Sequence, residues 1–212
     1  MKRVSLLFVI TIVILFASCA PAKNYSGVTV DKEKIKGKAY HNIFIIAMTA
    51  DIQVRVQLET DLAKLIESRG LKAVKSVDAI PPSLSDPKMP TKEEIDSKLK
   101  TSGCDAIFIA SLLKKEDNVN YTSGHQTHRT ALMGNYYGFY VFSYTTATAP
   151  GYVTQDKSYL IQSNFYDVAS DELMWSVESG VFAPSSLAQF SKIYLTHLVN
   201  QLEEEKVIKK TN

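Results

Sequence analysis

Thiol and imidazole side chains are the first candidates for chemistry in this 212-residue chain, which has two cysteines and four histidines. Cys104 stands at the entry to a buried strand expected at 106–113 and has no evident partner base, so we expect it to pack as a small hydrophobic residue. His125 and His128 could place two imidazoles on one metal ion, but structural zinc takes four protein ligands and catalytic zinc three. The pair is more typical of a solvated loop, and we predict no metal site.

Three aspartates fall at the ends of expected elements. Asp51, Asp105 and Asp167 stand where strands or helices begin or end, and carboxylates at such positions often cap backbone amides. His41 precedes the first expected strand and should face water, whereas His197 falls near the inward side of the last expected helix. The chain has neither a Gly-x-Ser-x-Gly nucleophile turn nor a phosphate-binding glycine loop. These patterns predict no catalytic residue, no cofactor and no enzymatic activity.

The first nineteen residues have the pattern of an export signal. A basic start, Met1-Lys2-Arg3, precedes an apolar stretch at 4–17, in which only two side chains are polar. At about 1.5 Å per helical residue, this stretch is too short to cross about 30 Å of hydrocarbon. It ends in Phe16-Ala17-Ser18-Cys19, which resembles the bacterial lipobox, where a lipoprotein signal peptidase cuts before an acylated cysteine. We therefore predict that residues 1–18 are removed and that a lipidated Cys19 anchors the protein to a membrane.

Ala20 refines the membrane placement, and the charge balance bears on nucleic acid as a partner. Inner-membrane retention typically places Asp after the lipidated cysteine, so Ala20 favours the outer membrane, with the domain facing the periplasm. Removal of Lys2 and Arg3 lowers the 24 basic residues to 22, equal to the 22 acidic ones, which gives no electrostatic case for nucleic acid. The alternatives to a lipid anchor are an ordinary secreted protein with an incidental cysteine and an uncleaved anchor.

The remaining length fits one domain at 42–208. Residues 19–41 are polar and rich in Lys, Gly and Ser, which predicts a solvated tether. Continuous apolar runs predict strands, whereas apolar residues at helical spacing predict helices. The expected elements are strands at 43–48, 71–77, 106–113, 159–168 and 173–178, and helices at 52–69, 91–103 and 187–202.

This order predicts an α/β fold, a three-layer or two-layer sandwich with a mixed sheet in the order β-α-β-α-β-insertion-β-β-α. The last two strands should form a hairpin in which Leu173, Trp175 and Val177 share one face. A capping box at Thr91–Glu94 predicts the start of the second helix.

Residues 118–157 form an insertion that the sandwich does not require, and long connections of this kind are usually functional or disordered. Six aromatic residues occupy nine positions within it: Tyr136, Tyr137, Phe139, Tyr140, Phe142 and Tyr144. Their rings could anchor a protein partner, enter the lipid interface or belong to a membrane hairpin. The competing interpretation is a hairpin whose rings cover the domain's own sheet. The sequence leaves the partner-binding and sheet-covering interpretations level.

Two short motifs carry a resemblance to known proteins. They are Asn164-Phe165-Tyr166-Asp167 and Trp175-Ser176, which follow the lipobox and the Tyr-rich insertion. With them, the chain resembles a group of uncharacterised bacterial envelope lipoproteins. Their architecture is similar to that of the amino-terminal domain of TolB, the activator lipoproteins of penicillin-binding proteins and the curli-secretion lipoprotein. The resemblance implies a fold and an envelope location, and it carries over no catalytic residue.

These observations lead to two hypotheses about function. The first is a non-catalytic, membrane-anchored envelope lipoprotein that binds a periplasmic or outer-membrane protein through its aromatic insertion. The alternative, implied by the resemblance to the curli-secretion lipoprotein, is an oligomeric export or channel component. The identity of the partner and the oligomeric state stay open at this point.

Overall fold

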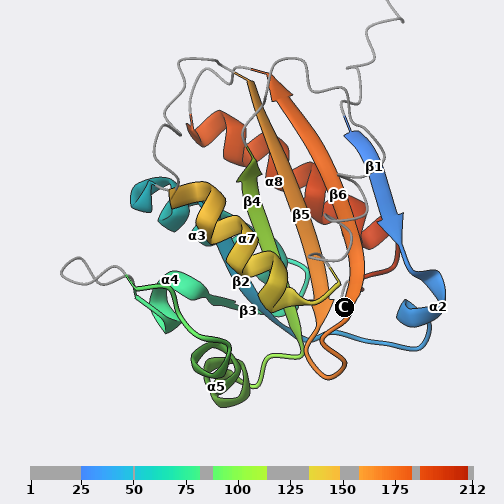
Figure 1. Ribbon diagram of the computed structural model, residues 1–212. Coiled ribbons are helices and arrows are strands. Elements are labelled where there is room, and N and C mark those ends of the chain that lie inside the picture. Colours follow the sequence, from blue (N-terminus) through green and yellow to red (C-terminus); the bar gives the residue numbers. More distant parts are fainter. Residues whose placement is uncertain are drawn as a thin grey trace, which may run out of the picture.

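The computed structural model describes residues 25–49, 51–81, 88–113, 134–148, 158–182 and 187–209. Within these ranges the chain forms one six-stranded sheet with helices on both faces (Figure 1). The strands are β1 (Tyr25–Val30), β2 (Asn42–Met48), β3 (Lys72–Lys75), β4 (Ala106–Leu113), β5 (Ser158–Asp167) and β6 (Leu173–Phe182). The helices are α2 (Lys32–Ile35), α3 (Ile52–Glu67), α4 (Ser76–Ala79), α5 (Lys92–Ser102), α7 (Tyr136–Thr148) and α8 (Leu187–Glu204).

The sheet is mixed, with strand order β1-β6-β5-β4-β2-β3. β2 pairs in parallel with β3 and β4, whereas the pairs β4–β5, β5–β6 and β6–β1 are antiparallel. The predicted α/β class and mixed sheet are confirmed, and helices on both faces make the described part a three-layer sandwich. Among the described residues, no helix combines the length and the apolar character needed to cross a bilayer.

Alternation along β2 divides the core between the two faces of the sheet. Ile43 and Ile45 pack on the side of α3 and α8, and Phe44 and Ile46 pack on the side of α5 and α7. All four side chains are buried, as expected for a strand covered on both faces. The continuous apolar run in the sequence is therefore explained by helices on each side.

Local signals set the ends of the helices as predicted. Asp51 caps α3 by accepting hydrogen bonds from the amides of Gln53 and Val54. The capping box of Thr91 and Glu94 is formed at the start of α5. These caps satisfy amides that a helix leaves without an internal partner, so the sequence alone locates them.

Residues 25–41, hereafter the amino-terminal segment, correct the predicted tether, which is wrong from Tyr25 onward. β1 runs antiparallel to β6, with Tyr25 opposite Ser179 and Val30 opposite Trp175. α2 follows, and the side chain of Ile35 is buried in the core beneath α8. An edge strand gains its hydrogen bonds from a partner distant in sequence, so the polar composition of this stretch did not reveal it.

The insertion gives a second correction, because its aromatic stretch is the helix α7 and not a hairpin. The buried residues of α7 are Tyr136, Phe139, Tyr140, Ser143 and Ala147, spaced as one face of a helix. This face packs on β4 and β2, so its rings cover the domain's own sheet, but from a helix and not from the hairpin of the competing interpretation. Aromatic residues favour strands when considered singly, and the sheet surface beneath them overrides that preference.

A bulge at the start of β6 gives a third correction. Tyr166 lies opposite Leu173 and Phe165 lies opposite Trp175, so Met174 is the extra residue on β6. Met174 and Trp175 consequently pack in the core on the α8 side, whereas Leu173 packs on the α7 side. The prediction that Leu173 shares a face with Trp175 and Val177 is therefore wrong for Leu173.

Candidate functional site

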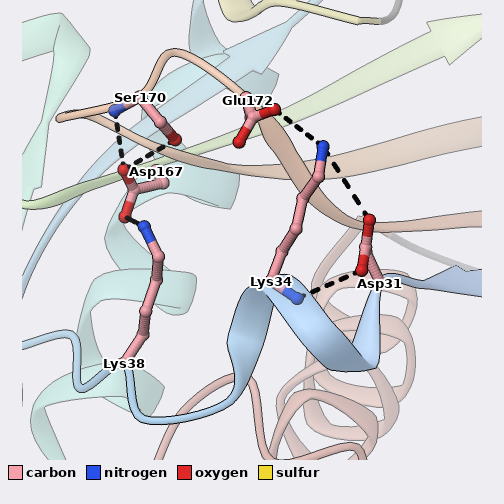
Figure 2. A network of polar contacts seen from close by, with 6 residues as sticks. All are labelled: Asp31, Lys34, Lys38, Asp167, Ser170 and Glu172. Carbon is pink, nitrogen blue, oxygen red and sulfur yellow. Dashed lines mark hydrogen bonds and ion pairs between the residues drawn. The ribbon is translucent and has the colours of Figure 1, made fainter.

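A group of polar side chains lies where the amino-terminal segment passes the turn between β5 and β6. Asp167 accepts hydrogen bonds at 2.5 Å from Lys38 Nζ and at 3.1 Å from the hydroxyl of Tyr40. Its other oxygen accepts from the amide and the hydroxyl of Ser170, at 2.8 and 2.9 Å. We call Lys38, Tyr40, Asp167 and Ser170 the Asp167 cluster. Figure 2 shows Lys38 extending from the amino-terminal segment to the carboxylate of Asp167.

Burial and hydrogen bonding set the charge state of the Asp167 cluster. Only 7% of the Asp167 side chain is exposed, and this burial on its own would raise the pKa of the carboxyl group. The hydrogen bonds from Lys38, Ser170 and Tyr40 outweigh burial, so the pKa of Asp167 is lowered. Burial, with the nearby Asp167 charge, raises the pKa of Tyr40, so its phenol stays protonated and donates. All the donors around Asp167 therefore act on a carboxylate with no oxygen left free as a base.

A second ion pair holds the same segment a short distance away. Lys34 Nζ lies 2.8 Å from Glu172 Oε1, at the beginning of β6 (Figure 2). Asp31 caps α2 by accepting from the amide of Lys34, and the amide of Asp31 donates to the carbonyl of Met174. The side chains of Lys34 and Glu172 are 41% and 46% exposed. This pair is therefore solvated, whereas the Asp167 carboxylate is buried.

Three members of these groups also line an open pocket of about 390 Å³. Lys38, Tyr40 and Asp167 form its walls with Cys104 and Asp105. Asp105 accepts from the amides of His41 and Asn42 at 2.8 and 3.0 Å, so it caps backbone as predicted.

The thiol in this pocket is not poised to react. Burial and, to a smaller extent, the Asp105 carboxylate raise the pKa of the Cys104 thiol to about 11, so it is protonated at neutral pH. Its side chain packs in the core on the α5 side, as predicted. The pocket therefore presents a neutral thiol beside two carboxylates that are already engaged.

The opposite end of the sheet holds a fully buried carboxylate that the sequence analysis missed. Glu59 accepts from the amides of Ala47 and Val77, at 3.0 and 2.9 Å, and from the hydroxyl of Ser76 at 2.6 Å. Arg55 Nε donates to the same carboxylate at 3.1 Å. These donors compensate the charge of Glu59, whose side chain is 0% exposed, and they connect α3 to β2 and α4. A glutamate inside the apolar stripe of α3 was the sequence signal for this site.

A third cluster fastens the first turn of α7. The hydroxyl of Tyr136 donates to Asp96, and Lys92 Nζ lies 2.9 Å from the same carboxylate. The amide of Tyr136 donates to Asp171 at 3.1 Å. The ammonium group of Lys92 lies 4.7 Å from the centre of the Tyr136 ring. The start of α7 is therefore joined both to α5 and to the turn before β6.

The two motifs behind the family resemblance meet across β5 and β6. Asn164 lies opposite Ser176, whose hydroxyl donates to Asn164 Oδ1 at 2.9 Å. Asn164 Nδ2 donates in turn to the hydroxyl of Tyr166 at 2.8 Å. Phe165 lies opposite Trp175 on the other face, in the core under α8. In this structure the motifs build the interior of the hairpin, with Asp167 as the residue that reaches the amino-terminal segment.

The six aromatic residues predicted to bind a partner do not share one environment. Tyr136, Phe139 and Tyr140 are 2%, 0% and 4% exposed, so in this structure they are core residues and the prediction for them is corrected. Tyr137, Phe142 and Tyr144 are half-buried and remain candidates for contact with a partner. Helical periodicity produces the division, because the sheet covers one side of α7.

The remaining predicted residues fall into three groups. His41 is exposed, as predicted, with its ring beside Asp105, and Asp51 caps α3 as predicted. His197 is exposed, so the prediction that it lies near the inward side of the last helix is wrong. Cys19 and the pair His125 and His128 lie outside the described residues. Within the described ranges, no group of three or more His, Cys, Asp or Glu side chains is arranged to hold a metal ion.

The fold and the polar clusters together define a three-layer α/β domain whose carboxylates connect its own elements. No family model matches the chain, and no curated protein matches its sequence. Solved structures with a similar fold include PelC from Paraburkholderia phytofirmans, a dodecamer, at TM-score 0.39 and 7% identity over 89% of this chain and 96% of that chain. Lipoprotein GNA1162 from Neisseria meningitidis aligns at TM-score 0.38 and 11% identity over 76% of this chain and 95% of that chain. TolB from Acinetobacter baumannii aligns at TM-score 0.36 and 13% identity over 78% of this chain and 28% of that chain. The likeness to these envelope proteins is one of architecture, and at these scores it carries no argument about function.

Proposed function

We propose that this chain is a non-catalytic, lipid-anchored protein of the cell envelope whose domain binds a protein of the periplasm or outer membrane. The observation that carries the proposal is the pairing of β1 with β6, because it connects the predicted lipid site to the sheet almost directly. The apolar leader, the lipobox at Cys19 and Ala20 after it support an anchor in the outer membrane.

The contacts of the amino-terminal segment then have a mechanical role. An anchor followed by a long solvated tether would leave the domain free to turn above the bilayer. Instead, the chain after Tyr25 is fixed by β1, by the Asp167 cluster and by the ion pair of Lys34 and Glu172. We assign to these contacts the task of holding the domain in one orientation relative to its anchor.

The state of the carboxylates supports a non-catalytic role. Asp167, Asp105 and Glu59 each accept at least two hydrogen bonds from donors of the chain itself. A general base needs an oxygen within reach of a substrate proton, and these oxygens point at amides and at neighbouring side chains. Their arrangement is that of residues which connect elements of a fold.

The outer side of α7 is the surface that we assign to the partner. It carries Tyr137, Val141, Phe142 and Tyr144, all half-buried, on a helix without a charged residue. Aromatic side chains offer large contact areas at a small cost in side-chain entropy, which is why they are common in protein interfaces. The buried side of the same helix fixes the backbone that presents them.

Site-specific photo-crosslinking in cells tests this assignment. A photoreactive phenylalanine at Tyr137 or Tyr144 should capture the same envelope protein, whereas the same group at Lys98, exposed on α5, should not. The three variants should accumulate to equal levels, since none of these side chains is fully buried.

Two outcomes would contradict the proposal. Absence of adducts at both α7 positions, in cells that produce the protein normally, would remove α7 as the partner surface. Adducts of the chain with itself would favour the oligomeric export or channel component that the family resemblance suggested.

A further inference from the structure

Three large apolar side chains are exposed among the described residues, and two of them are neighbours on one helix. Ile52 is 40% exposed and Val56 is 43% exposed. They are four residues apart on the first two turns of α3, so they project on the same side. The exposed side chains beside them are Gln53 and Gln57, which carry no charge, and Asp51, whose carboxylate is engaged in capping α3. This pair is an apolar feature that packing inside the domain does not explain.

The register of the sheet places this pair at the same end of the molecule as the start of β1. Met48, the last residue of β2, lies opposite Ser111 of β4, and the row continues through Gln162 and Glu178 to Ser26 of β1. α3 begins just beyond Met48. Figure 1 shows this arrangement from the side, with β1 starting at the end of the sheet where β6 finishes. With strands about 4.8 Å apart, the row spans only about 20 Å.

The length of chain before β1 limits the distance of this end from the anchor. Tyr25 is six residues after the predicted lipid site at Cys19. Six fully extended residues reach about 20 Å, so the start of β1 cannot lie farther than that from a cysteine at the bilayer surface. With the proposed anchor at Cys19, the end of the sheet where β1 starts, which also carries the first turns of α3, is the end held within this reach of the bilayer.

We infer that Ile52 and Val56 contact the bilayer that holds the acylated Cys19. The two side chains enter the headgroup region as the first turns of α3 approach it, and burial of their apolar surface restricts rotation of the domain about its anchor. This inference rests on the proposed lipid anchor. It goes further by identifying the face of the domain that is turned to the membrane. The occupant of the apolar surface is therefore lipid and not a second protein.

Fluorescence quenching in nanodiscs tests the inference on the full acylated chain. A small thiol-reactive fluorophore is placed at Ile52→Cys, at Val56→Cys and, as a matched control, at Glu67→Cys. Glu67 is exposed at the other end of the same helix, about 22 Å away at 1.5 Å per residue. The native Cys104 is buried and protonated, so it should not be labelled. Nanodiscs made with brominated phospholipid should quench the labels at 52 and 56 several-fold more than the label at 67.

Mass spectrometry of the same samples separates this inference from the proposed function. If Cys19 is acylated and all three labels are quenched equally or not at all, the bilayer contact is wrong and the anchor stands. If Cys19 carries no acyl chain, the anchor itself is wrong and the inference fails with it. A label at Gln53→Cys, on a neighbouring side of the helix, should be quenched less than those at 52 and 56, and equal quenching at all three positions would overturn a specific contact by Ile52 and Val56.

Discussion

The amino-terminal segment, which the sequence placed outside the core, and α7, whose place the sequence left open, are both packed onto the sheet in the structure, by different forces. The amino-terminal segment combines the burial of Ile35 and Tyr40 with polar contacts, namely the strand pairing of β1 and the hydrogen bonds of Asp167. α7 is held mainly by buried rings, with Phe139 at 0% exposure as the deepest of them. The stability that polar contacts supply changes when the pH or a side-chain charge changes, whereas the stability that apolar packing supplies falls when side-chain volume is removed.

The difference indicates separate tasks for the two regions. Hydrogen bonds and ion pairs are directional, so they fix the angle at which a segment leaves the domain. Apolar burial is not directional but supplies most of the stabilisation of a fold. In the proposed function, the amino-terminal segment sets the orientation of the domain relative to its anchor, and α7 contributes to the core while presenting its outer side. Substitutions in the two regions should therefore have different effects.

The largest effect is expected for Phe139→Ala in α7. Its ring lies 6.4 Å from that of Tyr166 and is fully enclosed, so truncation leaves a cavity in the core on that face of the sheet. We expect a loss of about 3–5 kcal/mol in the free energy of unfolding, measured by urea denaturation. Thr145→Ala, exposed on the same helix, should change it by less than about 0.5 kcal/mol. Equal effects at the two positions would show that α7 does not pack as described.

An intermediate effect is expected for Asp167→Asn. The substitution keeps the shape of the side chain but removes the negative charge of the carboxylate that accepts hydrogen bonds from Lys38 and Tyr40. Hydrogen bonds to a charged group contribute about 1.5–3 kcal/mol, and we expect a loss of that size in the free energy of unfolding. An unchanged free energy would mean that the Asp167 cluster does not hold the amino-terminal segment.

The pH dependence of the same comparison gives a sharper test of the cluster. Because the pKa of Asp167 is lowered in the folded state, its charge stabilises the fold fully above its unfolded pKa of about 3.9. That stabilisation is lost as the pH falls through the lowered pKa of the folded state. The difference in stability between the native protein and Asp167→Asn should therefore be constant from pH 7 to about 5 and shrink in stronger acid. A difference that grows on acidification would have the wrong sign for a lowered pKa.

The smallest effect is expected for Glu172→Gln, the matched partner of Asp167→Asn. Glu172 also pairs with a lysine of the amino-terminal segment, but both side chains of that pair are solvated. Water and salt screen such pairs, so their net contribution is small. The midpoint of thermal unfolding should stay within experimental error of the native value. A loss as large as that of Asp167→Asn would show that charge, and not burial, decides the strength of these contacts.

The parts of the fold predicted correctly from sequence are those with local signals. Asp51 and Thr91 cap helices through amides two or three residues away, and the apolar runs of β2 and β4 reflect helices on both faces. Elements that depend on distant partners were missed. β1 acquires its pairing from β6, and the helix of α7 acquires its packing from β4.

The Asp167 cluster likewise has one part that the sequence predicts and another that only the tertiary fold brings together. The sequence located Asp167 at the end of a strand and predicted a backbone cap, and Ser170 supplies that part. Lys38 and Tyr40 lie in the stretch interpreted as a tether, and only the tertiary fold brings them to the carboxylate. Tyr40, an aromatic residue two positions before β2, was the one local sign that this stretch packs against the domain.

Amide hydrogen exchange on the full chain in membranes shows whether the amino-terminal segment belongs to the folded domain. β1 and the amide of Asp31, which donates to Met174, should exchange as slowly as the paired amides of β6. Exchange of residues 25–31 at the rate of an unstructured peptide, with β6 still protected, would show that this segment is not part of the folded domain. The domain would then hang on a free tether, and neither its orientation nor its membrane contact would follow.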